Sequence, residues 1–242
     1  MRKRTVASAE VGETLAGLAP AAPTPRMRNL LERLEAAQLS SATLLRAQGR
    51  VQQARRAEQF GARIRLTLDE PAAARRMHAR SERLRAYPER RLLFEEALDA
   101  AMSFVGGDLG NIQLSHRGST RLRIAFAHGF DAEFLEHFAV VDDDSSVCGR
   151  AAQRGAQTVI ADVRHDPAFA AHGEIAAASG FQAVQSTPVL GPAGDLRGMI
   201  STHFRRAHRP QRRDLLMLEW YAERLGAVLA DRTPRPDAGS LH

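Results

Sequence analysis

The stretch LGNIQLSHRGSTRLRIAFAH, residues 109–128, decides the fold that the sequence predicts. It holds two strand-like runs, 109–115 and 122–128, which are separated by a short loop containing Gly118. Because side chains alternate along a strand, Asn111 and Gln113 share one face of the first run. The stretch therefore predicts an antiparallel hairpin with polar side chains on one of its faces.

Further strands and helices surround this hairpin. Other strand-like runs follow at residues 158–160, 181–190 and 195–204. Helical segments precede, interrupt and follow the strands, at residues 89–104, 131–138, 147–152, 166–179 and 210–231. Asp131 is the expected N-cap of the second of these helices. This order predicts an α+β fold: a central antiparallel sheet has helices on both faces, and a pocket lies between the sheet and the inserted helices.

The chain is predicted to divide into a disordered leader, a helical extension, an α+β domain and a flexible tail, at residues 1–25, 26–88, 89–231 and 232–242. The leader is small, polar and punctuated by proline, which is typical of a disordered segment. Within the extension, a helix is predicted from Asp69, as its N-cap, to Tyr87, with Pro71 in its first turn.

The helical extension also shows the four- and three-residue steps of a coiled-coil seam. The seam positions are Leu30, Leu34, Ala37, Ser41, Leu44, Gln48 and Val51. Since several of them are small or polar, the seam is a weak one. We expect an amphipathic helix that packs on a partner or on a second copy, in a homodimer. A helix folded back on the chain's own domain and a nucleic-acid-binding arm are the alternatives.

The composition favours a cytoplasmic protein that does not enter a membrane. Hydrophobic residues make up 44% and charged residues 26% of the chain, as is ordinary for a globular protein. No apolar run approaches the ~20 residues that cross a bilayer, and the N-terminus lacks the apolar stretch of a signal peptide. The chain has a net charge of +6, and almost all of its basic residues are arginines. Together with the many alanines, this indicates codon bias rather than a nucleic-acid-binding surface.

Several short strings give the domain a more specific character. They are GNIQL (110–114), HGF (128–130), SVCGRA (146–151), VRHDPAF (163–169), VQSTPV (184–189) and GMISTHF (198–204). In this order and spacing, residues 91–231 resemble the GAF domain, in the variety found next to bacterial sensor histidine kinases. The resemblance implies a sensory domain that binds a small molecule or a partner.

Departures from the family's patterns narrow the chemistry that the resemblance implies. The sequence lacks the NKFDE-type constellation of the cyclic-nucleotide-binding members, and the residues around Cys148 do not resemble a bilin attachment site. Reduction of methionine sulfoxide needs a nucleophilic thiolate and a resolving thiol, whereas this chain has one cysteine. No kinase, Walker A or cyclase motif is present. We therefore expect no catalytic residue and no enzyme activity, and the sequence identifies no cofactor.

The candidate ligand-binding residues are polar or aromatic positions of the predicted strands and loops: Asn111, Gln113, Phe130, Cys148, Gln185, Ser186, Ser201 and His203. Each has a structural alternative. His203 can be hydrogen-bonded within the core, Cys148 can pack as a small apolar side chain, and the other polar groups can pair across strands. The spacing of the histidines forms no His-x3-His ligand pair on a helix, so no metal site is predicted.

The sequence thus predicts a non-catalytic regulatory protein. A small molecule or partner would engage the pocket, the flanking helices would carry the signal, and a separate signalling protein such as a sensor kinase would receive it. A protein-docking scaffold with a vestigial pocket is the alternative, and a nucleic-acid-associated regulator is the less favoured one.

Overall fold

The helical extension begins with a helix whose N-terminus is capped by Thr24 and whose first residue is Pro25. In the computed structural model, which describes residues 23–116 and 119–232, the Thr24 hydroxyl accepts a hydrogen bond from the backbone N–H of Met27 at 3.3 Å. Pro25 follows in the first turn, where a missing N–H costs nothing. Helix α2 (Pro25–Ala47) then runs to a turn at Gly49, whose φ of 71° leads the chain into α3 (Val51–Asp69). Residues 1–22 of the predicted leader and 233–242 of the predicted tail lie outside the described residues.

Helices α2 and α3 pair through a narrow apolar seam. Leu31 of α2 and Ile64 and Leu68 of α3 form its core. Beside them Glu35, only 8% exposed, accepts a hydrogen bond from Nε of Arg65 at 3.0 Å. This hairpin is the basis of the first of two compact units, which ends at Ala79.

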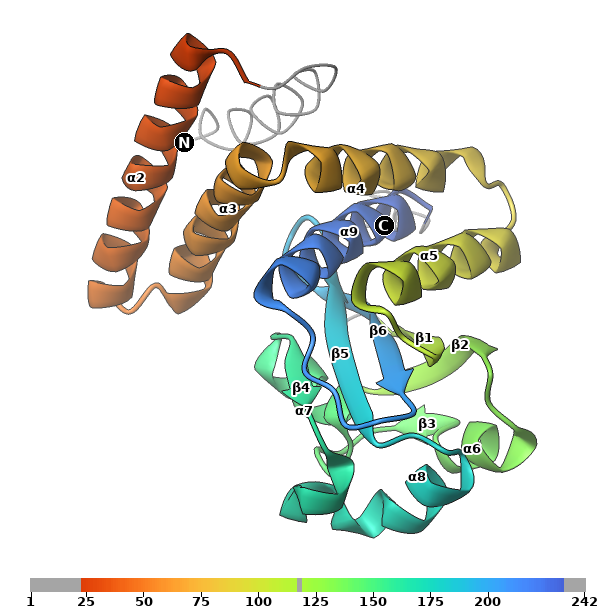
Figure 1. Cartoon of the computed structure of the whole chain (residues 1–242). Coiled ribbons are helices and arrows are strands. Elements are labelled where there is room, and N and C mark those ends of the chain that lie inside the picture. The colour runs from red at the N-terminus through yellow and green to blue at the C-terminus, as the bar shows by residue number, and fades with distance from the viewer. Residues whose placement is uncertain (1–22, 117–118, 233–242) are drawn as a thin grey trace, which may run out of the picture. The chain divides into compact units, whose positions relative to one another are not determined.

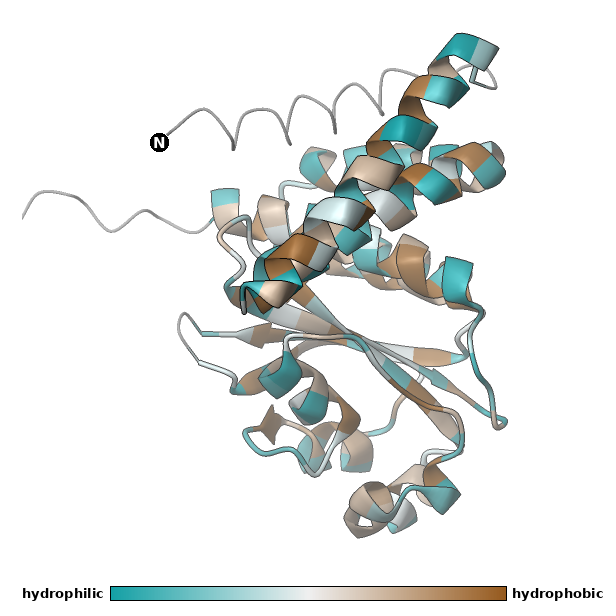
Figure 2. Cartoon of the chain, turned by 90° about the vertical axis from the view of Figure 1, so that its left-hand side faces the viewer, coloured by the Kyte–Doolittle hydropathy of each residue, from teal (hydrophilic) through white to brown (hydrophobic). Residues whose placement is uncertain are grey.

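Of the predicted coiled-coil positions, Leu34 packs on the α2–α3 core, but most of the others lie off the face on which α2 pairs with α3. Leu30 and Leu44 are 58% and 64% exposed, whereas the neighbouring Leu31 is buried. The turn at Gly49 also separates Val51 from the other seam positions. Helix α2 has leucines in two helical phases, and pairing with α3 uses the other one. Figure 2 shows apolar and polar stretches alternating along the helices of this unit.

Helix α4 (Pro71–Arg83) and the 3-10 turn η1 (Leu84–Ala86) complete the predicted second helix. Asp69 does not serve as its N-cap, because it is the last residue of α3 and α4 starts after Glu70. No helix among the described residues is long and apolar enough to span a membrane.

The second unit, from Arg80 onward, is organised by a six-stranded antiparallel sheet in the order β3-β2-β1-β6-β5-β4 (Figure 1). The strands are β1 (Leu109–Ser115), β2 (Leu122–His128), β3 (Val140–Val141), β4 (Thr158–Ile160), β5 (Ala183–Leu190) and β6 (Leu196–Phe204). The predicted hairpin and the predicted antiparallel sheet are confirmed. Only β3 was not predicted, since two residues are too short to show a period.

Helices cover both faces of this sheet, as Figures 1 and 2 show. One layer contains α5 (Arg90–Val105) and α9 (Arg212–Asp231). Gly226 lets α9 lie on the end of β5, because an added Cβ would come within 2.1 Å of the Leu190 carbonyl oxygen. The other layer contains the inserted segments α6 (Ala132–His137), α7 (Val147–Arg154), η2 (Val163–His165), η3 (Pro167–His172) and α8 (Gly173–Ala178). Asp131 caps α6 as predicted, accepting a hydrogen bond from the N–H of Phe134.

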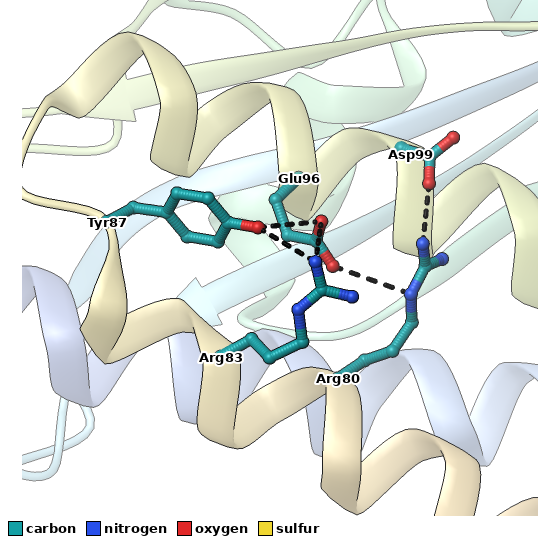
Figure 3. Close-up of polar contacts among 5 residues, drawn as sticks. All are labelled: Arg80, Arg83, Tyr87, Glu96 and Asp99. Atoms are coloured by element: carbon teal, nitrogen blue, oxygen red, sulfur yellow. Dashed lines mark hydrogen bonds and ion pairs between the residues drawn. The ribbon is translucent and has the colours of Figure 1, made fainter.

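A polar cluster holds the C-terminal end of α4 and the following turn against α5 (Figure 3). Its centre is the carboxylate of Glu96, whose side chain is 12% exposed. The Arg80 guanidinium lies 3.5 Å from this carboxylate and also pairs with Asp99 at 2.7 Å. On the other side, the Tyr87 hydroxyl donates to Glu96 at 3.1 Å, and Arg83 lies 3.7 Å away. We call these five residues the linker clamp.

Neutralising the centre of the linker clamp should loosen this attachment. We expect Glu96→Gln to lower the free energy of unfolding by about 1–2 kcal/mol, because the amide keeps the shape but loses the charge-assisted contacts. Asp99→Asn is the matched control: its side chain is 69% exposed, so little change is expected. Urea unfolding of both variants measures the difference, and equal stability losses would contradict the central role of Glu96.

Candidate functional site

A small cavity lies between the sheet and the inserted helical segments. The sheet contributes Asn111, Gln113, Val184, Ser186, Ser201 and His203. The inserted layer and the segment before β5 contribute Phe134, Phe138, Ser146, Val147, Cys148, Phe169 and Phe181. The space that the centre of a water molecule can reach is about 20 Å³. This is close to what a single water needs.

Strand alternation places the polar side chains of this cavity. Asn111 of β1 pairs with Ser201 of β6, which in turn pairs with Ser186 of β5. Residues that are paired across neighbouring strands point to the same face of a sheet. The three side chains therefore form one row across the centre of the sheet, where the hydroxyls of Ser186 and Ser201 are hydrogen-bonded at 2.8 Å.

Three polar atoms at the cavity have no hydrogen-bond partner among the described residues. They are Oδ1 of Asn111, Oε1 of Gln113 and Nδ1 of His203. The three residues are 3%, 1% and 5% exposed, so bulk water does not satisfy them. Because an unsatisfied buried polar group costs about 1–3 kcal/mol, their gathering around one cavity indicates a place for a polar occupant.

His203 lies in an aromatic cage. The ring centroids of Phe181, Phe130 and Phe134 are 4.7, 4.9 and 5.7 Å from its own, all in edge-to-face geometry. Burial lowers the pKa of His203 to about 3, so the imidazole is neutral. Depending on its tautomer, the free Nδ1 can donate or accept one hydrogen bond.

Cys148 follows the residue that starts α7, and its thiol points to the same cavity. Burial raises the pKa of the thiol, although hydrogen bonds from Ser146 and Gln113 oppose this. The Ser146 hydroxyl lies 3.2 Å from Sγ. A neutral thiol is a poor nucleophile. No charged side chain lines the cavity, and no group of three or more metal-ligating side chains occurs among the described residues.

Two sequence-predicted site residues do not line the cavity. Gln185 points to the opposite face of β5, because it precedes the inward-facing Ser186; there its amide is hydrogen-bonded to the hydroxyls of Thr187 and Thr202. Phe130 stacks on Phe134 with centroids 3.6 Å apart, behind the lining. The other six predicted residues do line the cavity.

Four aromatic residues of the site were not predicted from the sequence: Phe134, Phe138, Phe169 and Phe181. Phe134 and Phe138 are four residues apart, so they fall on one face of α6 and its C-cap. That spacing was a usable signal. Nothing in the local sequence relates Phe169 and Phe181 to them, since they come from η3 and from the segment before β5.

Two of the strings that carried the family resemblance meet at the outer side of the cavity. Arg150 of α7 forms hydrogen bonds to both carboxylate oxygens of Asp166, at 3.3 and 3.2 Å. Asp166 also caps η3 by accepting from the N–H of Phe169. Gly149 is required here, because an added Cβ would come within 1.8 Å of the Asp143 carbonyl oxygen. These contacts hold the turn before α7, α7 itself and η3 together.

Comparison with known proteins identifies the domain. The family model of the GAF domain matches residues 90–230. No curated protein sequence matches the chain. Similar solved structures include the A. aeolicus nlh2 GAF domain in an inactive state, at 21% identity and a TM-score of 0.51, with 69% of this chain and 99% of that chain covered.

Two further structures are similar at comparable levels. The GAF domain of a phosphoenolpyruvate-protein phosphotransferase from Coxiella burnetii has 12% identity and a TM-score of 0.58, over 67% of this chain and 95% of that one. Free methionine-R-sulfoxide reductase from Neisseria meningitidis, in complex with its substrate, has 16% identity and a TM-score of 0.53, over 66% and 89%. At such identities the likeness concerns the fold.

The neutral state of His203 should make the folded protein sensitive to acid. In the unfolded chain the imidazole takes up a proton near its ordinary pKa of about 6.5, whereas the folded state does not, so stability falls as the pH drops below that value. From pH 7.5 to 5 we expect His203 to contribute a loss of about 2 kcal/mol in the free energy of unfolding. His203→Gln should remove this contribution, whereas the contribution of His172, whose pKa burial also lowers, should remain. Denaturant unfolding at the two pH values measures it, and an equal pH dependence in both proteins would contradict the prediction.

Proposed function

Because the chain belongs to the GAF domain family, we propose that it is a non-catalytic sensory protein that binds a small uncharged molecule in this cavity. One observation carries the proposal: Asn111, Gln113 and His203 each direct an unpartnered buried atom at the same space. A bound molecule with hydrogen-bonding groups would satisfy all three. Its binding would then be passed on through the helices that flank the sheet.

The electrostatics of the cavity favour a ligand without net charge. Its polar lining consists of amides, hydroxyls, a thiol and an imidazole that burial keeps neutral. A charged ligand would lose its hydration without gaining an opposite charge, and this costs a large amount of binding free energy. The phenylalanine side chains on the other side suit an apolar or aromatic body. The ligand class is therefore a small neutral molecule with a polar edge and an apolar face.

The chemistry of the cavity residues also supports the proposal that the protein is not a catalyst. The only cysteine of the chain has a raised thiol pKa, and His203 holds too low a pKa to act as a base near neutral pH. A resolving thiol for sulfoxide reduction is absent from the sequence. The similarity to a methionine-R-sulfoxide reductase therefore does not suggest the same reaction for this chain.

The sheet itself can carry a signal from the cavity to the flanking helices. Ser186 and Ser201 face the cavity, so their neighbours Thr187 and Thr202 face α5 and α9. Gln157, just after α7, donates to the Thr187 hydroxyl at 2.7 Å and to the Leu215 carbonyl oxygen of α9 at 3.3 Å. A shift of α7 would thus move contacts of α9. A separate signalling protein would read out the change.

The ligand proposal can be tested with a matched pair of variants. The 242-residue protein is screened by thermal shift against neutral and charged small metabolites, and native mass spectrometry detects any retained molecule. We expect neutral compounds to raise the Tm. Asn111→Leu should abolish this rise because it removes a cavity-facing hydrogen-bonding group. Thr202→Val, on the opposite face of β6, should retain it.

Three results would count against this ligand. Stabilisation by charged metabolites only would show that the electrostatic argument is wrong. No shift with any compound would favour the protein-docking scaffold. Turnover of a stabilising compound by the purified protein would contradict the non-catalytic assignment.

We propose further that the first unit forms a homodimer through the seam positions that α3 leaves exposed, Leu30 and Leu44. Both are leucines, so burying their side chains against a second copy would be favourable. Leu44→Glu should convert a dimer to a monomer in sedimentation velocity experiments. Glu32→Ala, at an exposed charged position of the same helix, serves as the control. A monomeric wild-type protein at micromolar concentration would contradict the dimer.

A further inference from the structure

An unbroken series of side-chain hydrogen bonds crosses the outer layer of the domain. Nε2 of His137 lies 2.9 Å from Nδ1 of His172, and Nε2 of His172 lies 2.9 Å from the Ser145 hydroxyl. That hydroxyl in turn lies 2.6 Å from Oδ1 of Asp143. None of these residues lines the cavity, and no sequence motif connects them.

The directions of the hydrogen bonds in this series follow from the charge of Asp143 and the protonation state of His172. Hydrogen bonds from the hydroxyl and the backbone N–H of Ser145 hold the pKa of Asp143 below its ordinary value, so the carboxylate only accepts. Ser145 must then donate to Asp143 and accept from Nε2–H of His172. Burial lowers the pKa of His172, which favours its neutral form. In that form Nδ1 of His172 accepts from Nε2–H of His137.

The hydrogen-bond directions exclude Ser145 as a catalytic serine. In a serine–histidine pair the hydroxyl proton must point at an unprotonated imidazole nitrogen. Here the proton of Ser145 points at Asp143, and the facing nitrogen of His172 carries its own hydrogen. The series is thus a structural connection rather than a nucleophile with its base.

The series joins three segments that cover the cavity. His137 ends α6 and precedes the lining residue Phe138, while Ser145 precedes the lining residue Ser146. His172 ends η3, and its ring packs on Phe138 and on Phe169 with centroid distances of 5.1 and 5.3 Å. Breaking the series would therefore free α6, the turn before α7 and η3 from one another.

We propose that the series Asp143–Ser145–His172–His137 is a latch that closes the outer wall of the cavity. With about 20 Å³ of accessible space, the cavity has no room for a molecule much larger than water, so the wall must move outward to admit one. The latch would gate this entry for any such molecule. Its action therefore does not depend on the sensory function proposed above.

Acid is expected to open the latch. A proton added at Nδ1 of His172 removes the acceptor that Nε2–H of His137 uses in the closed arrangement. The groups that face His172 are His137 on α6, Asp143 in the turn and Arg150 on α7. Burial, His137 and Arg150 disfavour protonation of His172, whereas Asp143 favours it. Burial lowers the pKa of His172, so closure is favoured at neutral pH and weakened in acid.

Cys148 is a natural reporter of this opening, because it is the only cysteine of the chain and lies inside the wall. Its rate of labelling by 4,4′-dithiodipyridine is measured on the full-length protein at pH 7.5. Ser145→Ala and His172→Phe, which keeps the ring packing, each remove two hydrogen bonds of the series. We expect both variants to label at least about five- to tenfold faster. His165→Gln is the control, since this exposed histidine pairs with Asp162 outside the latch.

Global unfolding is separated by measuring the free energy of unfolding of each variant under the same conditions. Faster labelling beyond the change in the unfolding constant supports the latch. Unchanged labelling, or a rise fully accounted for by global unfolding, overturns it. If either of these two variants fails to fold, His137→Ala at the exposed end of the series is labelled instead, and the same two outcomes support or overturn the latch.

A pH series adds a second readout. Labelling rates between pH 7.5 and 5.5 are divided by those of glutathione at each pH, which removes the intrinsic reactivity of the thiol. The corrected rate should rise in acid for the wild-type protein and rise less for His172→Phe. Identical corrected profiles for the two proteins would overturn the acid-opening mechanism.

Discussion

Neighbouring residues of a β-strand point to opposite faces, and in this domain three central strands, β1, β6 and β5, serve two different layers. Their register puts Asn111, Ser201 and Ser186 in one row toward the inserted helices. The same register sends Gln185 and Thr202 toward α5 and α9, where they hydrogen-bond to each other. A slip by one residue would exchange the two sets and destroy both the cavity and the helix-facing network.

The two layers differ in what they do with buried polar groups. On the helix-facing side, Gln157, Gln185, Thr187 and Thr202 satisfy one another. On the cavity side, hydrogen-bonding capacity remains unused at Asn111, Gln113 and His203. Buried unsatisfied groups are costly and therefore rare in folded proteins. Three of them meet at this one cavity, and this is the basis of the binding site proposed above; another, the hydroxyl of Tyr221, lies on α9.

Closure of the cavity depends on a layer with little regular structure. The inserted segments are short helices and turns, tied together by side-chain contacts such as Arg150 with Asp166 and His137 with His172. Few of these contacts are deeply buried, so local opening costs less there than in the sheet or in α9. The sheet, which supplies the hydrogen-bonding groups, thus faces a layer that can open at lower cost, as the proposed ligand exchange would require.

Much of this architecture could be predicted from the sequence. The strands at 109–115 and 122–128 and the cap at Asp131 are local features, because strand period and capping chemistry act over a few residues. The polar residues of the site on the strands could be predicted for the same reason, because alternation within a strand determines which side chains share a face. The family strings extended this to the whole domain.

Only the tertiary structure decided which helix face α2 uses, because Leu30 and Leu31 offer two phases and the choice depends on Ile64 and Leu68 of α3. It likewise decided that Gln185 faces away from the cavity, that Phe169 and Phe181 join Phe134 and that His137 meets His172 across 35 residues of sequence. These are contacts between segments distant in the chain, and no local pattern encodes them. The sequence by itself determined the elements and the family; packing of one element on another determined the site.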